Sequence, residues 1–136
     1  MLLQRGAADS PTFRALLHAI EHSDVIVHVE QVMQSAHGLA GATRFITRAG
    51  GYRYVRITLY GVWPVHQAIA ILGHELQHAS EMASAGWVID QQTCLELFQT
   101  IGRRTCDDQH ICFDTEAAVI AGHRVWSDLG HADAGE

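Results

Sequence analysis

The sequence predicts one α+β domain over residues 1–136, in which a small, mostly antiparallel three-stranded sheet packs on a buried helix and further C-terminal helices follow. Three observations predict this class. The 136 residues, 48% of them hydrophobic, suffice for one core and leave little room for a second. Alternating apolar and polar residues gather between residues 25 and 60. Helical periodicity of the apolar residues takes over after Pro64.

The N-terminal part is expected to form a tail and a helix. Residues 1–9 are predicted to be a flexible N-terminal tail, and they lack the apolar stretch of roughly 7–15 residues that a signal peptide needs. Ser10 and Pro11 then make a good helix start, with a serine cap followed by proline at the first helical position. Apolar residues recur at helical spacing from Phe13 to Ile20, so a helix is predicted to about His22.

Three strands are expected next. Residues 25–30 alternate as a β-branched strand, and residues 42–48 and 52–60 read as two strands joined across Ala49-Gly50-Gly51, which is a hairpin signal. In the last strand Val55, Ile57 and Leu59 share one face, which is the expected core face. We take Tyr52–Tyr60 as a candidate for the edge strand of the sheet.

Three helices are expected after the sheet. The first begins at Pro64, runs to about Ala85 and is ended by Gly86; its centre is apolar nearly all round, so it belongs inside the domain. A second is capped by Asp90 and runs to Gly102. Asp114 or its neighbour opens the last one, which runs to Gly130.

Composition and charge narrow the partners. Nine basic and fifteen acidic residues give a formal charge of −6, whereas nucleic acid and anionic membrane surfaces both require a basic patch. We therefore expect neither as a partner. Three cysteines are too few for a disulfide scaffold; Cys106 and Cys112 could close a small loop, and a structural zinc site there is disfavoured because no CxxC pair is present.

The chemistry is predicted on the buried helix, where residues 74–78 read His-Glu-Leu-Gln-His. Residues four apart on a helix face the same way, so His74 and His78 can hold one metal ion together. Glu75 lies beside them and can act as general base toward a metal-bound water. Zinc suits two imidazoles, a carboxylate and an open position, so one zinc ion per chain is predicted. The plain alternative is a pair of core histidines that are satisfied by hydrogen bonds alone.

The third zinc ligand is predicted on the last helix. At about 100° per residue, the small residues of that helix lie on the same face as Asp114, which would let the helix approach the His-Glu-x-x-His helix closely. Asp114 would then point at the metal, and Glu116 would point away. We favour Asp114 and keep Glu116 as the alternative third ligand. Glu81 lies too far along the helix to join His74 at one ion and is expected behind or outside the site.

The motifs resemble a family of small, largely uncharacterised bacterial zincin-like proteins, of the minimal gluzincin type. The resemblance rests on Ile-Leu-Gly-His-Glu-Leu-Gln-His-Ala at 71–79 and Phe-Asp-Thr-Glu-Ala-Ala-Val-Ile-Ala-Gly at 113–122, and it extends from about Ser10 to Leu129. The family's pattern has Glu-Thr where this chain has Asp114-Thr115. The match supports position 114, although aspartate is one carbon shorter. Many members carry export signals, which implies an extracytoplasmic location; a cytoplasmic one is the alternative.

The resemblance implies a zinc metallopeptidase in which Glu75 takes the proton of the attacking water and passes it to the leaving amine. A peptide or protein substrate would lie along the edge strand of the sheet. Tyr60, His123 and Arg124 are candidate helpers for the oxyanion, and none is assigned. Two alternatives remain open. One is a catalytically silent zinc-binding or interaction module with the same fold. The other is a zymogen-like form in which residues 1–10 or a further segment cover the metal.

Overall fold

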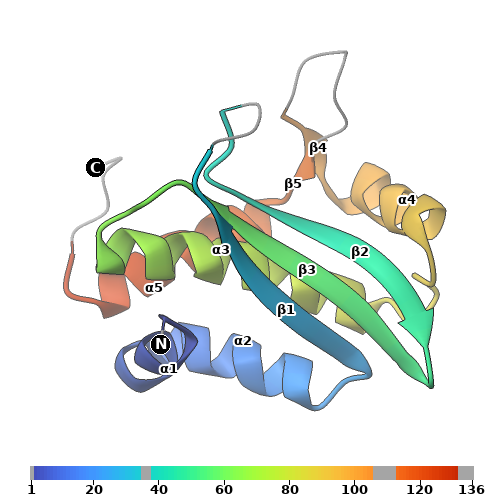
Figure 1. Ribbon diagram of the computed structural model, residues 1–136, viewed down its shortest axis with the longest axis horizontal. Coiled ribbons are helices and arrows are strands. Elements are labelled where there is room, and N and C mark those ends of the chain that lie inside the picture. The colour runs from blue at the N-terminus through green and yellow to red at the C-terminus, as the bar shows by residue number, and fades with distance from the viewer. Residues whose placement is uncertain (1, 35–37, 106–112, 132–136) are drawn as a thin grey trace.

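The computed structural model describes residues 2–34, 38–105 and 113–131 (Figure 1). The elements in chain order are α1 (Leu2–Asp9), α2 (Pro11–Glu21), β1 (Val25–Val32), β2 (Gly41–Ala49), β3 (Tyr52–Tyr60), α3 (Val65–Ser84), α4 (Gln91–Ile101), β4 (Arg103–Arg104), β5 (Phe113–Asp114) and α5 (Glu116–Asp128). The α+β class is confirmed. None of the helices described here combines the length and apolar content needed to cross a membrane. The loop predicted between Cys106 and Cys112 lies outside the described residues.

The three-stranded sheet is mixed, with the order β1-β3-β2. β3 pairs with β2 in antiparallel fashion and with β1 in parallel fashion, so the prediction of a mostly antiparallel sheet is wrong. Tyr52–Tyr60, which was the candidate for the edge strand, is instead the central strand, so that expectation is wrong. Val55, Ile57 and Leu59 are almost completely buried, and β3 has more buried residues than β1 or β2, as expected of a strand with neighbours on both sides. The hairpin at Gly50 and Gly51 is confirmed, and both have positive φ.

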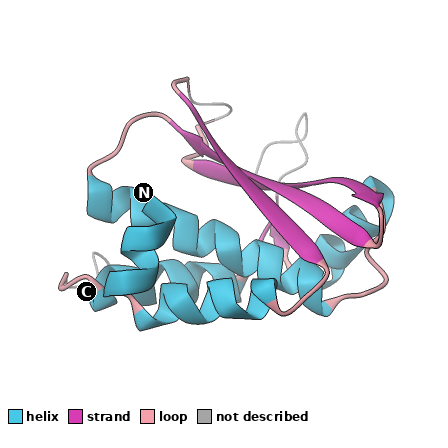
Figure 2. Ribbon diagram, turned by 60° about the horizontal axis from the view of Figure 1, so that its bottom comes forward, coloured by secondary structure: helices cyan, strands magenta, loops and turns pink. Residues whose placement is uncertain are grey.

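The hydrophobic core lies between one face of the sheet and the helices. Helices α2, α3 and α5 lie on the same side of the sheet, and none of the helices among the described residues covers its other face (Figure 2). Ile69, Leu72 and Leu76 of α3 are fully buried in the same cluster as the apolar face of β3. Helix α3 is therefore the buried helix that its sequence predicts, and polar groups on it must find partners.

The tail expected over residues 1–9 is instead helix α1 over Leu2–Asp9. Leu2 and Leu3 pack against the core. Gly6 allows the close approach to α2, since a β-carbon there would lie 2.6 Å from Phe13 Cε1. The absence of a side chain at Gly6 thus allows residues 2–9, which show no clear apolar pattern, to pack as a helix against α2. The predicted cap is confirmed, because Ser10 Oγ accepts from the Phe13 amide at 3.1 Å.

The end of α3 is held by Arg53, which the alternation of β3 does not single out. Arg53 is only 3% exposed and pairs with Asp24 at 2.6 Å. Its guanidinium also donates to the carbonyls of Met82, Ala83, Ala85 and Val88. A cation at the negative end of the helix dipole stabilises that end. Helix α3 ends at Ser84 with Ala85 as its cap, so Gly86 follows the cap as predicted, but Gly86 does not have a positive φ and the arginine satisfies the last carbonyls.

Helices α3 and α5 pack closely, as the row of small residues predicts. A β-carbon on Gly73 would lie 2.7 Å from Val125 Cγ2, and one on Gly122 would lie 3.4 Å from His74 Cβ. Helix α5 begins at Glu116 with Thr115 as its cap. The helix is thus opened by the neighbour of Asp114, which was one of the two expected starts, and Asp114 itself precedes the helix in β5.

Candidate metal centre

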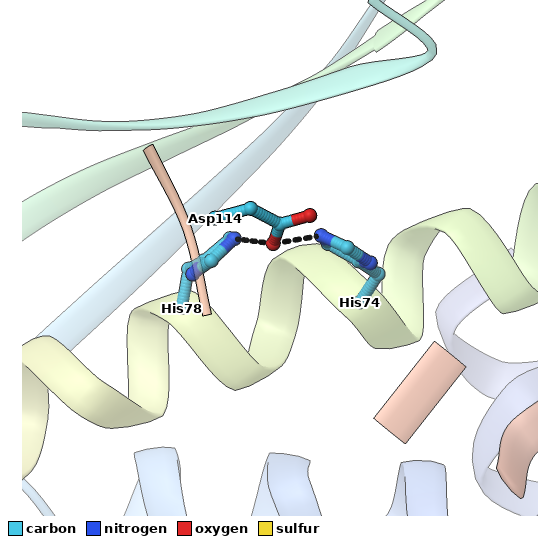
Figure 3. A group of neighbouring side chains, drawn as sticks. All are labelled: His74, His78 and Asp114. Atoms are coloured by element: carbon cyan, nitrogen blue, oxygen red, sulfur yellow. Dashed lines mark ion pairs between the residues drawn. The ribbon is translucent and has the colours of Figure 1, made fainter. Parts of the chain in front are cut away.

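Three side chains converge above α3 (Figure 3). His74 Nε2 lies 2.9 Å from Asp114 Oδ1, and His78 Nε2 lies 3.3 Å from the same oxygen. One ligand atom from each residue lies within 4.8 Å of the other two. Within residues 2–34, 38–105 and 113–131 this is the one group of three or more such side chains that could hold a metal ion. The structure thus brings together the residues that the sequence predicts as ligands.

The dimensions of the group fit a small tetrahedral ion. Bonds of about 2.0–2.1 Å to a central zinc place tetrahedral ligand atoms roughly 3.3 Å apart. The separation of 3.3 Å agrees with that spacing, and the 2.9 Å between His74 and Asp114 is a shorter, hydrogen-bonded distance. Both histidines present Nε2 to the carboxylate, so their rings already point to a common centre. Two nitrogens and one carboxylate oxygen form a donor set that zinc accepts, with a fourth position left for water.

Asp114 reaches the histidines because of a local feature of the chain before α5. Arg103 and Asp114 pair between β4 and β5, which ties the end of β5 to the segment that directly follows α4. Gly102 permits this contact, since a β-carbon there would lie 2.8 Å from the Asp114 carbonyl oxygen. The backbone at Asp114 therefore lies close enough to the histidines for the short aspartate side chain to reach both of them. Glu116, the alternative ligand, is exposed on the first turn of α5 and lies outside the group.

A hydrogen-bonded relay holds the His78 ring. Its Nδ1 lies 2.9 Å from Glu81 Oε1, and Glu81 Oε2 accepts from the Thr115 hydroxyl at 2.6 Å. Thr115 in turn caps α5 by accepting from the Ala118 amide. The carboxylate fixes the ring orientation and raises its basicity, as partners of metal-binding histidines do. Glu81 thus lies behind the site, as expected, and one helix cap is coupled to the orientation of a candidate ligand.

Without a cation, protons hold this group together. Burial opposes charge on His78, but its hydrogen bonds to Asp114 and Glu81 outweigh burial and raise its pKa to about 9. Burial likewise opposes charge on Asp114, yet the hydrogen bonds with His74 and His78 hold its pKa well below the usual range. The carboxylate is therefore ionised at neutral pH and available to a cation.

Glu75 is buried beside the three residues. Its Oε2 lies 3.9 Å from His74 Nε2, and burial raises its pKa, with the two histidines and Thr43 acting in the opposite direction. The Thr43 hydroxyl lies 2.8 Å from Oε1 and 3.1 Å from the backbone oxygen of Glu75. Gly41 leaves room for the side chain, because a β-carbon there would lie 3.1 Å from Glu75 Cγ. Strand β2 therefore supports Glu75 directly.

A cleft of about 960 Å³ opens over this group. Glu75, both histidines and Asp114 line it, and so do residues of β2, β3 and α4. Of the three candidate helpers, Tyr60 lines the cleft, whereas His123 and Arg124 are exposed on α5 and do not. Residues 2–10 do not line it either, because α1 packs on α2 and α3.

Comparisons with known proteins give no family for this chain: no family model, curated protein or solved structure matches it. The site therefore has to be interpreted from its own residues. Sequence reasoning missed Thr43 and Thr115, the two hydroxyls that hold Glu75 and Glu81. Their only sequence signals are a threonine in an alternating strand and a threonine before a helix, and both are common patterns.

Proposed function

We propose that the protein is a zinc-dependent hydrolase that cleaves peptide bonds, with His74, His78 and Asp114 holding one zinc ion and Glu75 acting as general base. The observation that carries the proposal is the convergence of the three ligand atoms beside a buried carboxylate. Two buried histidines alone would need only hydrogen-bond partners. A third converging ligand and a buried glutamate, all lining one cleft, are what a catalytic metal centre requires.

A bound zinc ion would supply a strong positive charge that lowers the pKa of a coordinated water and polarises a carbonyl. The chain's own residues handle the proton. Glu75 is placed to accept it, because its carboxylate lies beside His74 and faces the cleft. Burial disfavours the charged form of Glu75, which makes the carboxylate a better proton acceptor, and Thr43 keeps it in place. Glu75 then returns the proton to the leaving amine.

The proposed substrate is an extended peptide along β2. In the described part of the chain β2 pairs only with β3, so its other edge is open. This strand runs past the candidate site, since Gly41 and Thr43 both contact Glu75. An extended peptide can add to such an edge through main-chain hydrogen bonds and place alternate side chains in pockets. A small sheet beside a His-Glu-x-x-His helix, with an acid supplied later in the chain, also agrees with the resemblance to minimal gluzincins.

Metal content of the purified protein tests the site. We expect one zinc per chain for wild type by mass spectrometry, and loss of zinc in His78→Ala and Asp114→Ala. Glu116→Ala is the matched control: an exposed acid two residues from Asp114, which should keep its zinc. A protein that binds no zinc, even when zinc is supplied at neutral pH, would overturn the proposal. Zinc loss in Glu116→Ala but not in Asp114→Ala would reassign the third ligand.

Hydrolysis is tested separately with Glu75→Gln, which keeps the shape of the side chain and removes its basicity. Wild type should cleave members of a peptide library, while Glu75→Gln should retain zinc and lose cleavage. General bases contribute roughly 10²–10⁴-fold to a rate, so the loss should be at least of that order. Zinc bound with no cleavage by wild type would favour the silent metal-binding module instead. Cleavage that survives in Glu75→Gln would refute the assigned base.

A further inference from the structure

A pair of arginines lies on the helix-free face of the sheet. Arg44 of β2 and Arg56 of β3 are directly opposite each other in the antiparallel register. His28 of β1 is the partner of Arg56 on the other side, so the row across the three strands reads His28, Arg56, Arg44. Side chains opposite each other on one face of a sheet have β-carbons only about 4.5–5.5 Å apart. Two arginines and a histidine therefore form a row across the sheet, in a chain whose net charge is −6.

This arrangement costs the folded protein stability. Like charges directly opposite in a sheet destabilise it. The Nε of Arg56 is buried without a hydrogen-bond partner, and Glu30 Oε1 stays 4.0 Å away while accepting from Thr58. In the described part of the chain, Arg44 is exposed and no carboxylate forms an ion pair with it. An anion placed between the two guanidinium groups would remove both costs.

The same cleft contains the arginines and the candidate metal centre. Arg44, Arg56 and Glu30 line it together with His74, Glu75 and Asp114. On β2 the neighbouring residues Thr43 and Arg44 point to opposite faces of the sheet: Thr43 faces Glu75, and Arg44 faces the same side as Arg56. A peptide along the β2 edge would alternate in the same way. A residue next to the one at the metal centre would then present its side chain to Arg44.

We propose that Arg44 and Arg56 form an anion subsite that selects peptides with an acidic side chain beside the bond placed at the metal centre. The substrate assignment rests on the proposed function, while the binding of a carboxylate by the two arginines does not. Arginine suits this task because its planar fork matches a carboxylate with two parallel hydrogen bonds. The half-exposed Arg56, next to Glu30, forms one side of the subsite, and the exposed Arg44, which also lines the cleft, forms the other.

Peptide binding tests this without relying on hydrolysis. Glu75→Gln protein, which should leave peptides intact, is titrated into two fluorescent pools of short mixed-sequence peptides. The pools differ only in one internal residue, Asp in one and Asn in the other. A charge-assisted hydrogen bond favours the Asp pool by about tenfold in affinity. Adding Arg44→Gln should abolish that preference, and Arg44→Glu should reverse it. Arg48→Gln is the matched control: an exposed arginine on the same strand, outside the cleft, which should keep the preference.

Each outcome decides the matter. Equal affinity for the two pools, no binding of either pool, or loss of the preference in Arg48→Gln would each refute the anion subsite. Inorganic phosphate that binds through Arg44 while the pools bind alike would show a site for a free anion, which also refutes selection of a peptide side chain. An Asp preference that depends on Arg44, in a protein that cleaves nothing, would support the subsite and sink the peptidase proposal. Cleavage with no preference for an acidic residue would support the peptidase proposal and refute the anion subsite.

Discussion

Replacing Arg53 of β3 should strongly destabilise the protein, because its buried guanidinium donates to four carbonyls at the end of α3. Arg53→Met keeps the length of the side chain and removes all its donors. Two of the four carbonyls it serves, those of Met82 and Ala85, also accept from backbone amides. The carbonyls of Ala83 and Val88 would lose the guanidinium bond, at about 1–3 kcal/mol for each orphaned acceptor. With the lost charge at the helix end, the cost is roughly 3–5 kcal/mol.

The partner variant separates the carbonyls from the ion pair. Asp24 is 46% exposed whereas Arg53 is buried, so Asp24→Asn removes a half-solvated ion pair and leaves the four carbonyl bonds in place, at roughly 1–2 kcal/mol. Urea unfolding in the presence of a chelator measures both variants, and an unchanged m-value shows that the two-state comparison holds. Arg53→Lys should fall between them, because one ammonium cannot replace the fork. A cost of Arg53→Met below that of Asp24→Asn would refute this account of how α3 ends.

Four further outcomes follow from features of the core and the site. Gly73→Ala should cost about 1–3 kcal/mol in unfolding experiments, because the new methyl meets Val125 at 2.7 Å; a neutral result would mean that α3 and α5 separate freely. Glu81→Gln should weaken zinc affinity by roughly tenfold or more in competition with a chelator, since it loosens the His78 ring, and unchanged affinity would contradict that role. Burial raises the pKa of the Cys94 thiol to about 11, so peptide mapping should show slow alkylation of Cys94 at pH 8 until the protein unfolds; rapid labelling of the native protein would contradict it. Burial raises the pKa of Asp128, but the hydrogen bonds from Ser10 and Thr12 lower it more strongly, so the net shift is downward. The ionised carboxylate therefore stabilises the fold above its unfolded pKa of about 3.9, and this contribution is lost as the pH falls through the folded pKa. The destabilisation of Asp128→Asn in unfolding experiments should therefore shrink as the solution is acidified, and a deficit independent of pH would contradict it.

The elements were predictable where local signals agree with burial. Ser10 and Asp90 cap the helices that their positions predict, and the glycine pair after Ala49 makes the predicted hairpin. The strand order was not predictable, because β1 and β2 differ little in pattern. The central place of β3 goes with the burial of Val55, Ile57 and Leu59, and that burial depends on the whole core. Helix α1 was missed because its contact with α2 needs the absence of a side chain at Gly6.

In the candidate site, too, the residues set by local spacing were predictable and those set by long-range contacts were not. His74, Glu75 and His78 follow from helical spacing, which is a local property. Asp114 does lie beside both histidines, as expected, but the reasoning behind that expectation assumed a residue inside α5. The structure places Asp114 before the helix, where pairing of β5 with β4 sets its backbone. Thr43 contacts Glu75 across 32 positions of the chain, and no local pattern contains that contact.

The strand order also sets a sequence of events for folding. β2 and β3 are joined by the tight turn at Gly50 and Gly51, so their hairpin can form from neighbouring residues alone. β1 pairs only with β3 among the described strands, and β2 lies between them in the sequence. The parallel pairing of Val25 with Arg53 therefore closes a long loop of the chain. Pairing of this non-local kind is slow because chain entropy is lost before contacts compensate for it. We therefore expect the hairpin to form early and α2 and β1 to dock late, so that mutations in the hairpin slow folding and mutations in β1 speed unfolding.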